Sequence, residues 1–492
     1  MSWIYLSLGI LAAAGTFLFI GVLIYDLSQN KHTILHNFPV VGHFRYMLEK
    51  IGPELRQYIV TDNDEERPFS RDQRTWIYAS AKQQNNYFGF GTDNDLERTS
   101  NYLILKQSAF PKSVPLPNTA EYDDNHTLNC AKTLGGWRNR KKAFIPESAI
   151  YVSAMSYGSL GSAAVESINS GCGIAGALQN TGEGGISRYH LNGGDLILQL
   201  GTGYFGARNM DGSFCLKKLV DTVEKHPSVR AIEVKLSQGA KPGLGGHLPA
   251  AKVTGEIARA RGIPEGKACI SPSSHSTFSD VDSMLDFIEM LADETGLPVG
   301  IKSAVGEMKF WEELARQCDQ SGRAPDFISI DGGEGGTGSA PQAFADHVSM
   351  PFKLGFTRVR SAFEEECMED KIVFLGTGKV GFPIEAAFAF ALGCDMVGVA
   401  REALLSIGCI QAQRCHTGHC PAGITTHNKW LMAGLDPTLK SARLANYITS
   451  LRYDVIKLAA SAGLEHPSQL TKEHFEILDD QFGSRCASQV FC

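Results

Sequence analysis

Residues 149–155 read AIYVSAM, an apolar run followed at once by the glycine-containing loop SYGSLG at 156–161. A run of this length, with branched and aromatic side chains and a glycine-containing loop behind it, favours a buried strand over a helix. A longer segment of helical character comes next, and the same alternation recurs downstream. Strands that alternate with helices are typical of a parallel sheet of the α/β class.

The alternation gives eight predicted strands. They are AIYVSAM (149–155), GIAGAL (173–178), AIEVKL (231–236), ACIS (268–271), PVGIK (298–302), FISI (327–330), IVFL (372–375) and MVGVA (396–400). Eight strand–helix units favour a closed barrel over an open doubly wound sheet, in which that number has no special meaning. We therefore predict an α/β fold with a (β/α)8 TIM barrel over residues 149–405.

The N-terminus predicts a transmembrane anchor over residues 1–25. The segment from Trp3 to Tyr25 contains no Asp, Glu, Lys or Arg, and as a helix it would cross a ~30 Å hydrocarbon core. Basic residues follow this segment but do not precede it, so the positive-inside rule places the catalytic part in the cytoplasm. We expect a single-pass membrane protein that contacts the lipid bilayer through residues 3–25. A buried core helix and an uncleaved signal are the alternatives.

Two further regions flank the predicted barrel. Residues 26–148 are predicted to form an N-terminal covering region with little chemistry of its own, in which FRYMLEKIGPELRQYI (44–59) indicates a helix. A partner-binding surface is the alternative for this region. Residues 406–492 are predicted to hold a cysteine loop and a C-terminal helical region.

Charge excludes one class of partner. The 492 residues include 46 Lys and Arg against 53 Asp and Glu, a formal net charge of −7, and neither sign forms a long run. Nothing in the chain reads as a nucleic-acid motif, so we expect no nucleic-acid partner.

Glycine-rich loops follow the predicted strands, where a barrel carries its active site. They include QNTGEGG (179–185), DGGEGGTG (331–338) and GTGKVG (376–381). Such turns let the backbone approach a ligand and present N–H groups to a phosphate. Because barrel phosphate sites commonly follow the last two strands, the loops predict a phosphate-bearing cofactor. No GxGxxG follows a first strand with a ribose-binding acid behind it, which disfavours a Rossmann-bound NAD.

A cysteine loop lies beyond the last predicted strand. GCIQAQRCHTGHCP places Cys409, Cys415 and Cys420 within twelve residues, and thiolates are the ligands that iron–sulfur clusters require. Three cysteines without an obvious fourth favour a [3Fe–4S] cluster. Zinc with His416 or His419 as a fourth ligand and three unrelated core cysteines are the alternatives.

The motifs together resemble a known family. AMSYGSLG, QNTGEGG, IEVKLSQGAKPGLGGHLP, ISPSSH, IDGGEGGTGSAP and GCIQAQRCHTGHCPAGI resemble, in the same order, the synthase barrel of the ferredoxin- and NADPH-dependent glutamate synthases, over about residues 150–430. The resemblance implies an oxidoreductase acting on CH–NH2 donors that holds FMN and a [3Fe–4S] cluster. It implies amination of 2-oxoglutarate to glutamate through 2-iminoglutarate, with ammonia as a substrate and ferredoxin or a reductase as electron donor.

The resemblance also implies site residues. Lys235, Gln238 and Arg261 stand at the family's positions for substrate recognition, and Glu183 would orient ammonia or the imine, or cap a turn. An exposed helix position is the alternative for Arg261. The implied FMN site comprises Ala154, Met155, Ser156, Asn180, Lys302, Asp331, Gly332, Gly333, Gly335, Gly336, Thr337, Gly376, Thr377, Gly378, Ala400 and Arg401. The implied cluster ligands are Cys409, Cys415 and Cys420.

The chain also departs from the family pattern. No glutaminase domain is expected within residues 1–148. PSSHST (272–277) stands where the family has a PPPHHD-like stretch, Tyr204 stands where it has an arginine, and Asp195 matches a family acid only across an insertion or deletion. These departures and the membrane span motivate one alternative, a related flavin oxidoreductase acting on another amino or keto acid and exchanging electrons with a membrane carrier. A non-catalytic binding subunit is a further alternative, which would require the loss of cofactor residues that this chain retains.

Overall fold

The structure is a computed structural model that describes residues 2–29, 31–117 and 119–491. The chain divides into two compact units, Met1–Asp72 and Gln73–Cys492.

The first unit is helical. It contains α1 (Ser2–Ser28), α2 (Thr33–Asn37), α3 (Val41–Leu55) and a short π-helix, Arg56–Val60. By length and composition, Trp3–Ser28 is apolar enough to cross a membrane. The helix predicted for FRYMLEKIGPELRQYI is confirmed by α3 and the π-helix after it.

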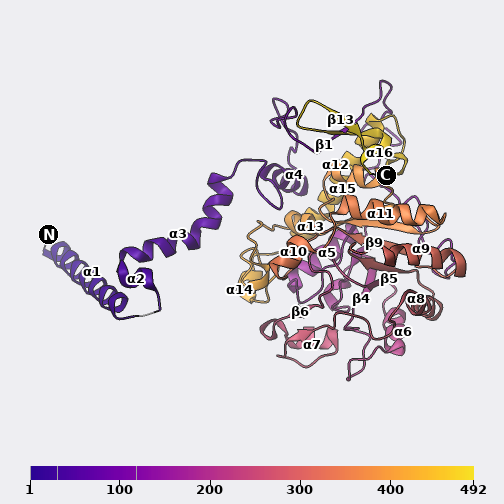
Figure 1. The fold of residues 1–492 in the computed structure, drawn as a ribbon. Helices are drawn as coiled ribbons and strands as arrows, with labels where there is room; N and C mark the ends of the chain where they lie inside the picture. The colour runs from indigo at the N-terminus through magenta and orange to yellow at the C-terminus, as the bar shows by residue number, and fades with distance from the viewer. Residues whose placement is uncertain (1, 30, 118, 492) are drawn as a thin grey trace. The chain divides into compact units, whose positions relative to one another are not determined.

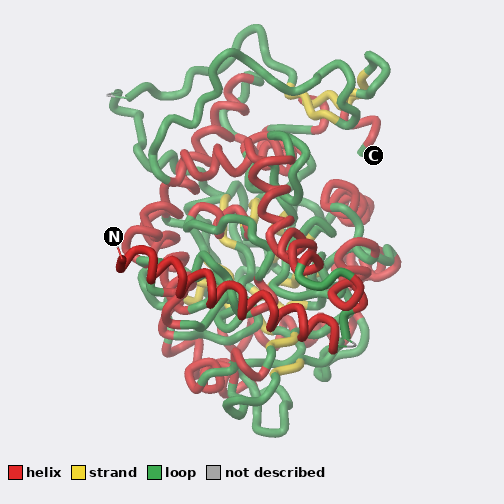
Figure 2. Tube along the Cα trace, turned by 90° about the vertical axis from the view of Figure 1, so that its left-hand side faces the viewer, coloured by secondary structure: helices red, strands yellow, loops and turns green. Residues whose placement is uncertain are grey.

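The second unit is built on a closed barrel of eight parallel strands, as predicted. The strands are β2 (Ile150–Val152), β3 (Gln179–Asn180), β4 (Leu196–Leu200), β5 (Val229–Lys235), β8 (Val299–Ser303), β9 (Phe327–Asp331), β10 (Val373–Thr377) and β11 (Met396–Val399). Each pairs with its neighbours in this order, and β11 closes the ring on β2. Figure 1 shows the strands at the centre of this unit, and Figure 2 shows them again among the surrounding helices.

Two of the eight strand predictions are wrong. GIAGAL was expected to be a strand, but its first half belongs to helix α5 (Ser162–Ala175), which Gly176 ends in the left-handed conformation with φ 63°. Glycine adopts this conformation at no steric cost. The strand that follows, β3, has only two residues.

ACIS is the other wrong prediction. Its strand is β7 (Cys269–Ile270), which pairs antiparallel with β6 (His247–Leu248) outside the barrel. The missing barrel strand is instead β4, in the sequence LILQL, all five residues of which are buried. The predicted number of strands is therefore correct although one predicted strand lies outside the barrel.

Helices cover the barrel, and a small sheet lies beside it. The covering helices are α6 (Leu216–Lys225), α7 (Gly255–Arg261), α8 (Val281–Thr295), α9 (Lys309–Ser321), α10 (Gln342–His347), α11 (Phe352–Glu365), α12 (Pro383–Ala391) and α13 (Arg401–Ser406). The remaining helices of this unit are α4 (Arg71–Ala81, which begins at the end of the first unit), α14 (Lys429–Met432), α15 (Pro437–Ser461) and α16 (Ala487–Val490). Helix α15 packs along α5. Strands β1 (Tyr102–Leu105), β12 (Phe475–Leu478) and β13 (Ser484–Cys486) form an antiparallel sheet.

The barrel interior is filled by apolar side chains near its N-terminal end. Tyr151, Ile197, Ala231 and Phe327 meet there, and Leu134 from the region before the barrel joins them. Side chains alternate across a strand, so the interior positions that follow Ala231 on β5 are Glu233 and then Lys235. The apolar end therefore serves stability, and the opposite end carries ionisable groups.

Candidate active site

The residues predicted to bind substrate and cofactor gather at the C-terminal mouth of the barrel. Asn180, Lys235, Asp331 and Thr377 are the last residues of β3, β5, β9 and β10. Lys235 pairs in register with Lys302 of the neighbouring strand β8. Because all strands run in parallel, these strand ends surround one opening.

Lys235 lies in a buried polar contact with two loop residues. Its Nζ is 3.0 Å from Glu183 Oε1 and donates to Gln238 Oε1 at 2.8 Å. Burial alone would raise the pKa of Glu183, but the charges of Lys235, Lys241 and Arg261 outweigh it and lower that pKa. Three predicted substrate-site residues, Lys235, Gln238 and Glu183, are thus in direct contact.

Arg261 is the fourth predicted substrate residue, and it is buried rather than exposed on its helix. Its Nη2 donates to Ser156 Oγ at 3.3 Å and to the Tyr157 carbonyl at 3.2 Å. In the described part of the chain, its Nε has no hydrogen-bond partner. The guanidinium is therefore held at the mouth by neutral groups, without a carboxylate partner within salt-bridge distance among the described residues.

Two charged residues of this site were not predicted. Lys241 is buried, and this burial lowers its pKa. Glu233 lies below the mouth, where its Oε1 accepts hydrogen bonds from Asn180 Nδ2 at 2.8 Å and Gln199 Nε2 at 2.6 Å. Burial raises the pKa of Glu233. The signal for Glu233 was an acid in the middle of the apolar run AIEVKL.

A tyrosine and a histidine support the strand end that carries Lys235. His275 Nε2 donates to the Lys235 carbonyl at 2.9 Å, and its Nδ1 is 3.0 Å from Tyr204 Oη. The same hydroxyl accepts from the backbone N–H groups of Ser276 and Thr277. Burial lowers the pKa of His275, which favours the neutral ring that this arrangement needs. Among these residues, Tyr204, Ser276 and Thr277 are the positions at which the sequence departs from the family pattern.

The predicted cofactor residues form a second group at the mouth. Lys302 Nζ is 3.3 Å from Ser153 Oγ and 3.6 Å from Asp331 Oδ2. Asp331 also accepts from Thr377 Oγ1 at 2.6 Å and from the Gly239 N–H at 3.0 Å. Asp331 thus joins the ends of β9 and β10 to the loop after β5, and it holds the amine of Lys302 in place.

The glycine loops pack closely against one another beside this group. Gly332 donates from its N–H to the Thr377 carbonyl at 2.9 Å, and Gly378 has a φ of 132°, which favours glycine. Arg401 donates to the Glu334 carbonyl, so its side chain lies across the loop that contains Gly335 and Gly336. An amine, a guanidinium and close-packed glycine backbone form a donor set that fits a phosphate-bearing flavin. The other implied FMN residues, Ala154, Met155, Ser156, Gly333, Thr337, Gly376 and Ala400, lie in or beside the loops that follow β2, β9, β10 and β11.

The three loop cysteines influence one another electrostatically. Burial raises the pKa of Cys409 to about 11 and also raises that of Cys415, with a further contribution from Cys420 in both cases. Burial would raise the pKa of Cys420 as well, but the backbone N–H groups of Thr425 and Ile424 outweigh it and lower that pKa. Lys252 Nζ lies close by and donates to the Cys415 carbonyl at 3.1 Å. Three neighbouring thiols with backbone donors and a lysine fit an iron–sulfur cluster in donor type.

A site for a single metal ion is not formed. Within residues 2–29, 31–117 and 119–491, no three His, Cys, Asp or Glu side chains are placed to hold one ion. Cys172, Cys269 and Cys394 are buried thiols.

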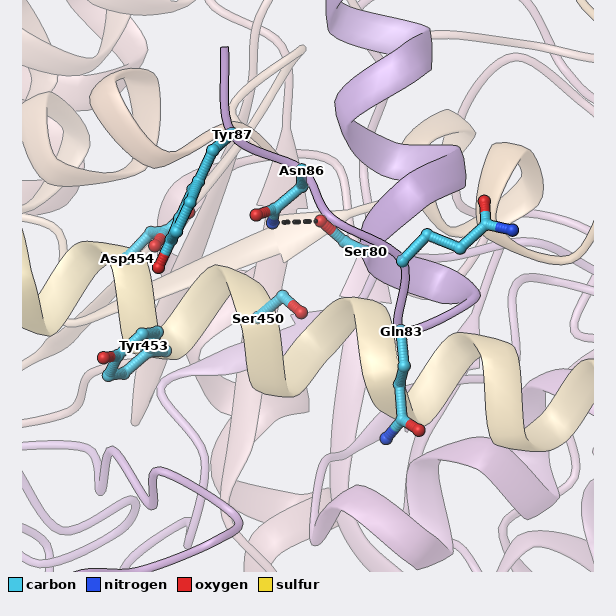
Figure 3. Close-up of a pocket in the computed structure, with 8 residues that line it drawn as sticks. Ser80, Gln83, Asn86, Tyr87, Ser450, Tyr453 and Asp454 are labelled. Atoms are coloured by element: carbon cyan, nitrogen blue, oxygen red, sulfur yellow. Dashed lines mark hydrogen bonds between the residues drawn. The ribbon is translucent and has the colours of Figure 1, made fainter. Parts of the chain in front are cut away.

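A separate cavity of about 210 Å³ lies between the end of α4 and helix α15. Ser80, Asn86, Tyr87, Ser450 and Asp454 are among its lining residues, and Asn86 Nδ2 donates to Ser80 Oγ at 2.9 Å (Figure 3). None of the predicted site residues lines this cavity.

A closed (β/α)8 barrel whose C-terminal mouth holds buried ionised groups has the architecture of a barrel enzyme. The conserved region in glutamate synthase matches residues 125–465. The chain belongs to the glutamate synthase family.

Two relatives in sequence support this assignment. The chain is 39% identical over 486 residues to the glutamate synthase large subunit-like protein YerD of Bacillus subtilis, covering 93% of this chain and 92% of that protein. It is 33% identical over 324 residues to the archaeal glutamate synthase (NADPH) of Methanocaldococcus jannaschii, and the match covers 65% of this chain and 59% of that protein. Among solved structures, the flavin-binding domain of baker's yeast flavocytochrome b2 is similar with a TM-score of 0.43 and 15% identity, over 81% of this chain and 82% of that domain.

Proposed function

We propose that the protein is an FMN- and iron–sulfur-dependent oxidoreductase that aminates 2-oxoglutarate to glutamate. The observation that carries this proposal is the buried excess of positive charge at the mouth, where Lys235, Lys241 and Arg261 face Glu183. Buried charges are stable only when they are paired. An anionic substrate with two carboxylates would supply the missing negative charge.

The chain's own residues would bind and orient this substrate. Lys235 would exchange part of its contact with Glu183 for one substrate carboxylate, and the Arg261 guanidinium would hold the other, since Arg can bind carboxylates through two parallel hydrogen bonds. Gln238 would contact the keto oxygen. Glu183 would then be available to accept a hydrogen bond from ammonia or from the imine.

The reaction needs two electrons. Ammonia condenses with the keto carbon and water leaves, which gives 2-iminoglutarate, and this imine becomes glutamate on gaining a hydride and a proton. FMN, when bound and reduced, supplies the hydride. Lys302 would place a positive charge beside the flavin, and Arg401 would bind its phosphate. The glycine loops at Gly332–Gly336 and Gly376–Gly378 would face its ribityl chain and phosphate.

Electrons would reach the flavin through a [3Fe–4S] cluster on Cys409, Cys415 and Cys420. A separate protein, ferredoxin or a reductase, would supply them. The protein would be anchored through α1 in a membrane, with the barrel on the cytoplasmic side, as the basic residues after α1 favour.

The Tyr204–His275 contact favours a second candidate function. Tyr204, which supports the substrate lysine through His275, contributes a hydroxyl where the family has an arginine. The neighbouring Ser276 and Thr277 also depart from the family's PPPHHD-like stretch. The same cofactors would then act on another amino or keto acid and exchange electrons with a membrane carrier.

The test uses the purified full-length protein. Its absorbance should show flavin, and chemical assay should find iron and sulfide. With a chemical reductant, ammonia and 2-oxoglutarate, mass spectrometry should detect glutamate. Lys235→Ala should abolish the product and the exposed Lys309→Ala should not. If flavin is present but no glutamate forms, bleaching of the flavin by a panel of amino acids tests the second candidate.

A matched cysteine pair tests the cluster. Cys415→Ala should remove the cluster iron and its electron paramagnetic resonance signal. Cys367→Ala, at an exposed cysteine, should retain both. Equal iron content in the two variants would contradict the assignment of the cluster to the cysteine loop.

A further inference from the structure

Helix α3 exposes a continuous apolar stripe. Its residues follow one another at intervals of three and four, which places them on one face of the helix. They are Val41, Phe44, Leu48, Ile51 and Leu55, exposed by 74%, 59%, 42%, 40% and 38%. Immediately beyond the helix, Tyr58, Ile59 and Val60 are exposed as well. Such a stripe is too regular for scattered surface apolar residues and indicates an interaction surface.

The other side of α3 is charged. Arg45 and Glu49 form an exposed ion pair at 3.3 Å, and Lys50 is exposed beside them. A helix with one apolar face and one charged face, and with little net hydrophobicity, is typical of segments that lie in the interface of a bilayer.

The start of α3 is fixed to the end of α1 within the first unit. Asp26, near the end of α1, accepts from the Val40 N–H at 2.8 Å and is 2.9 Å from His43 Nε2. Asp26 is fully buried in this contact. The apolar stripe therefore begins beside the end of the helix that is long enough to cross a membrane.

We propose that the apolar stripe of α3 lies in the headgroup–acyl boundary of the lipid bilayer. This inference depends on the proposed membrane span of α1, because the span would bring the end of α1, and with it Val40 and His43, to the membrane surface. Fifteen residues make a helix about 22 Å long, enough to bury the whole stripe parallel to the surface. The charged side with Arg45, Glu49 and Lys50 then faces water and the headgroups.

The experiment places a tryptophan on each face of α3 in the full-length protein. Phe44→Trp adds the probe to the stripe, and Lys50→Trp adds it to the charged side as the matched control. Both variants are reconstituted in vesicles of phosphatidylcholine and phosphatidylglycerol, and the wild-type emission is subtracted. Phospholipids with brominated acyl chains should quench the Phe44→Trp probe severalfold more than the Lys50→Trp probe, and acrylamide should show the reverse order.

Two results would overturn the proposal. Equal quenching of both probes by acrylamide would show that the stripe faces water. A Phe44→Trp probe protected from both quenchers would show that protein covers the stripe, either a second copy or another partner. Alkaline carbonate extraction tests the span separately, because a chain that does not span would be released from the vesicles whatever its α3 does.

Discussion

Glu183 and Lys235 approach to 3.0 Å at the barrel mouth, although one belongs to the loop after β3 and the other ends β5. The pair is the one close carboxylate–amine contact of Lys235 among the described residues. It orients the lysine amine before substrate arrives.

Breaking the buried Glu183–Lys235 pair should lower the free energy of unfolding much more than breaking an exposed ion pair with the same separation. Glu183→Gln leaves a buried ammonium without its partner, so the free energy of unfolding should fall by about 3–5 kcal/mol. The control is Glu465→Gln, which removes an exposed pair with Lys112, also at 3.0 Å, and should cost less than about 1 kcal/mol. Urea unfolding measures both, and equal losses would show that the mouth is hydrated.

Tyr204→Phe should weaken both stability and substrate binding. The hydroxyl bonds His275 and the N–H groups of Ser276 and Thr277, and leaving such buried groups unpaired costs about 1–3 kcal/mol. Because His275 supports the Lys235 carbonyl, KM for the substrate should rise more than kcat falls. Tyr189→Phe, at a half-buried phenol, should leave KM unchanged. An unchanged KM in Tyr204→Phe would limit this contact to a structural role.

Stability should fall between pH 7 and pH 5 because of His190. Burial lowers the pKa of this histidine to about 4, and its Nδ1 accepts from the Ser187 N–H at 3.1 Å. The neutral ring is therefore preferred in the folded state, whereas the unfolded chain takes up the proton near pH 6.5. The stabilisation of the folded state by the neutral His190 ring is fully present above pH 6.5 and is lost as the pH falls toward 4. It amounts to about 2 kcal/mol between pH 7 and pH 5. Urea unfolding of His190→Gln should show a correspondingly flatter pH dependence.

Gly239→Ala should disrupt the cofactor side of the mouth. A Cβ at Gly239 would lie 1.8 Å from the Gly332 carbonyl oxygen, so the two loops would have to separate. We expect a stability loss of about 1–3 kcal/mol and loss of flavin absorbance on gel filtration. Gly306→Ala is the control, because its Cβ would meet nothing within 4 Å. Full flavin retention by Gly239→Ala would place the flavin away from this loop contact.

The barrel could be predicted because most of its strands are short, apolar and followed by glycine-rich loops. Strand β3 could not be located, since two residues carry no periodicity. The apolar run GIAGAL beside it was mistaken for a strand, although its first half ends α5 and includes the exposed Ile174. ACIS resembled a barrel strand in composition, and only its pairing with β6 distinguishes it.

The sequence predicted which residues form the candidate site better than it predicted which of them are in contact. Lys235, Gln238, Arg261 and Glu183 all lie at the mouth, but the sequence does not show that Glu183 pairs with Lys235. Glu233 and the Tyr204–His275 contact depend on hydrogen bonds between different strands and loops. Such contacts exist only in the folded chain.

Strands β5 and β8 pair directly in register, Ile232 with Val299 and Lys235 with Lys302, although the chain between them leaves the barrel and forms the β6–β7 pair and helices α7 and α8. The pairing of β5 with β8 thus tolerates a long segment between them. That segment supplies Gln238, Arg261 and His275 to the substrate side, whereas Gly239 near its start contacts Asp331 on the cofactor side. Substitutions beyond Gly239 can therefore change substrate choice while the contact that fixes the cofactor side is kept.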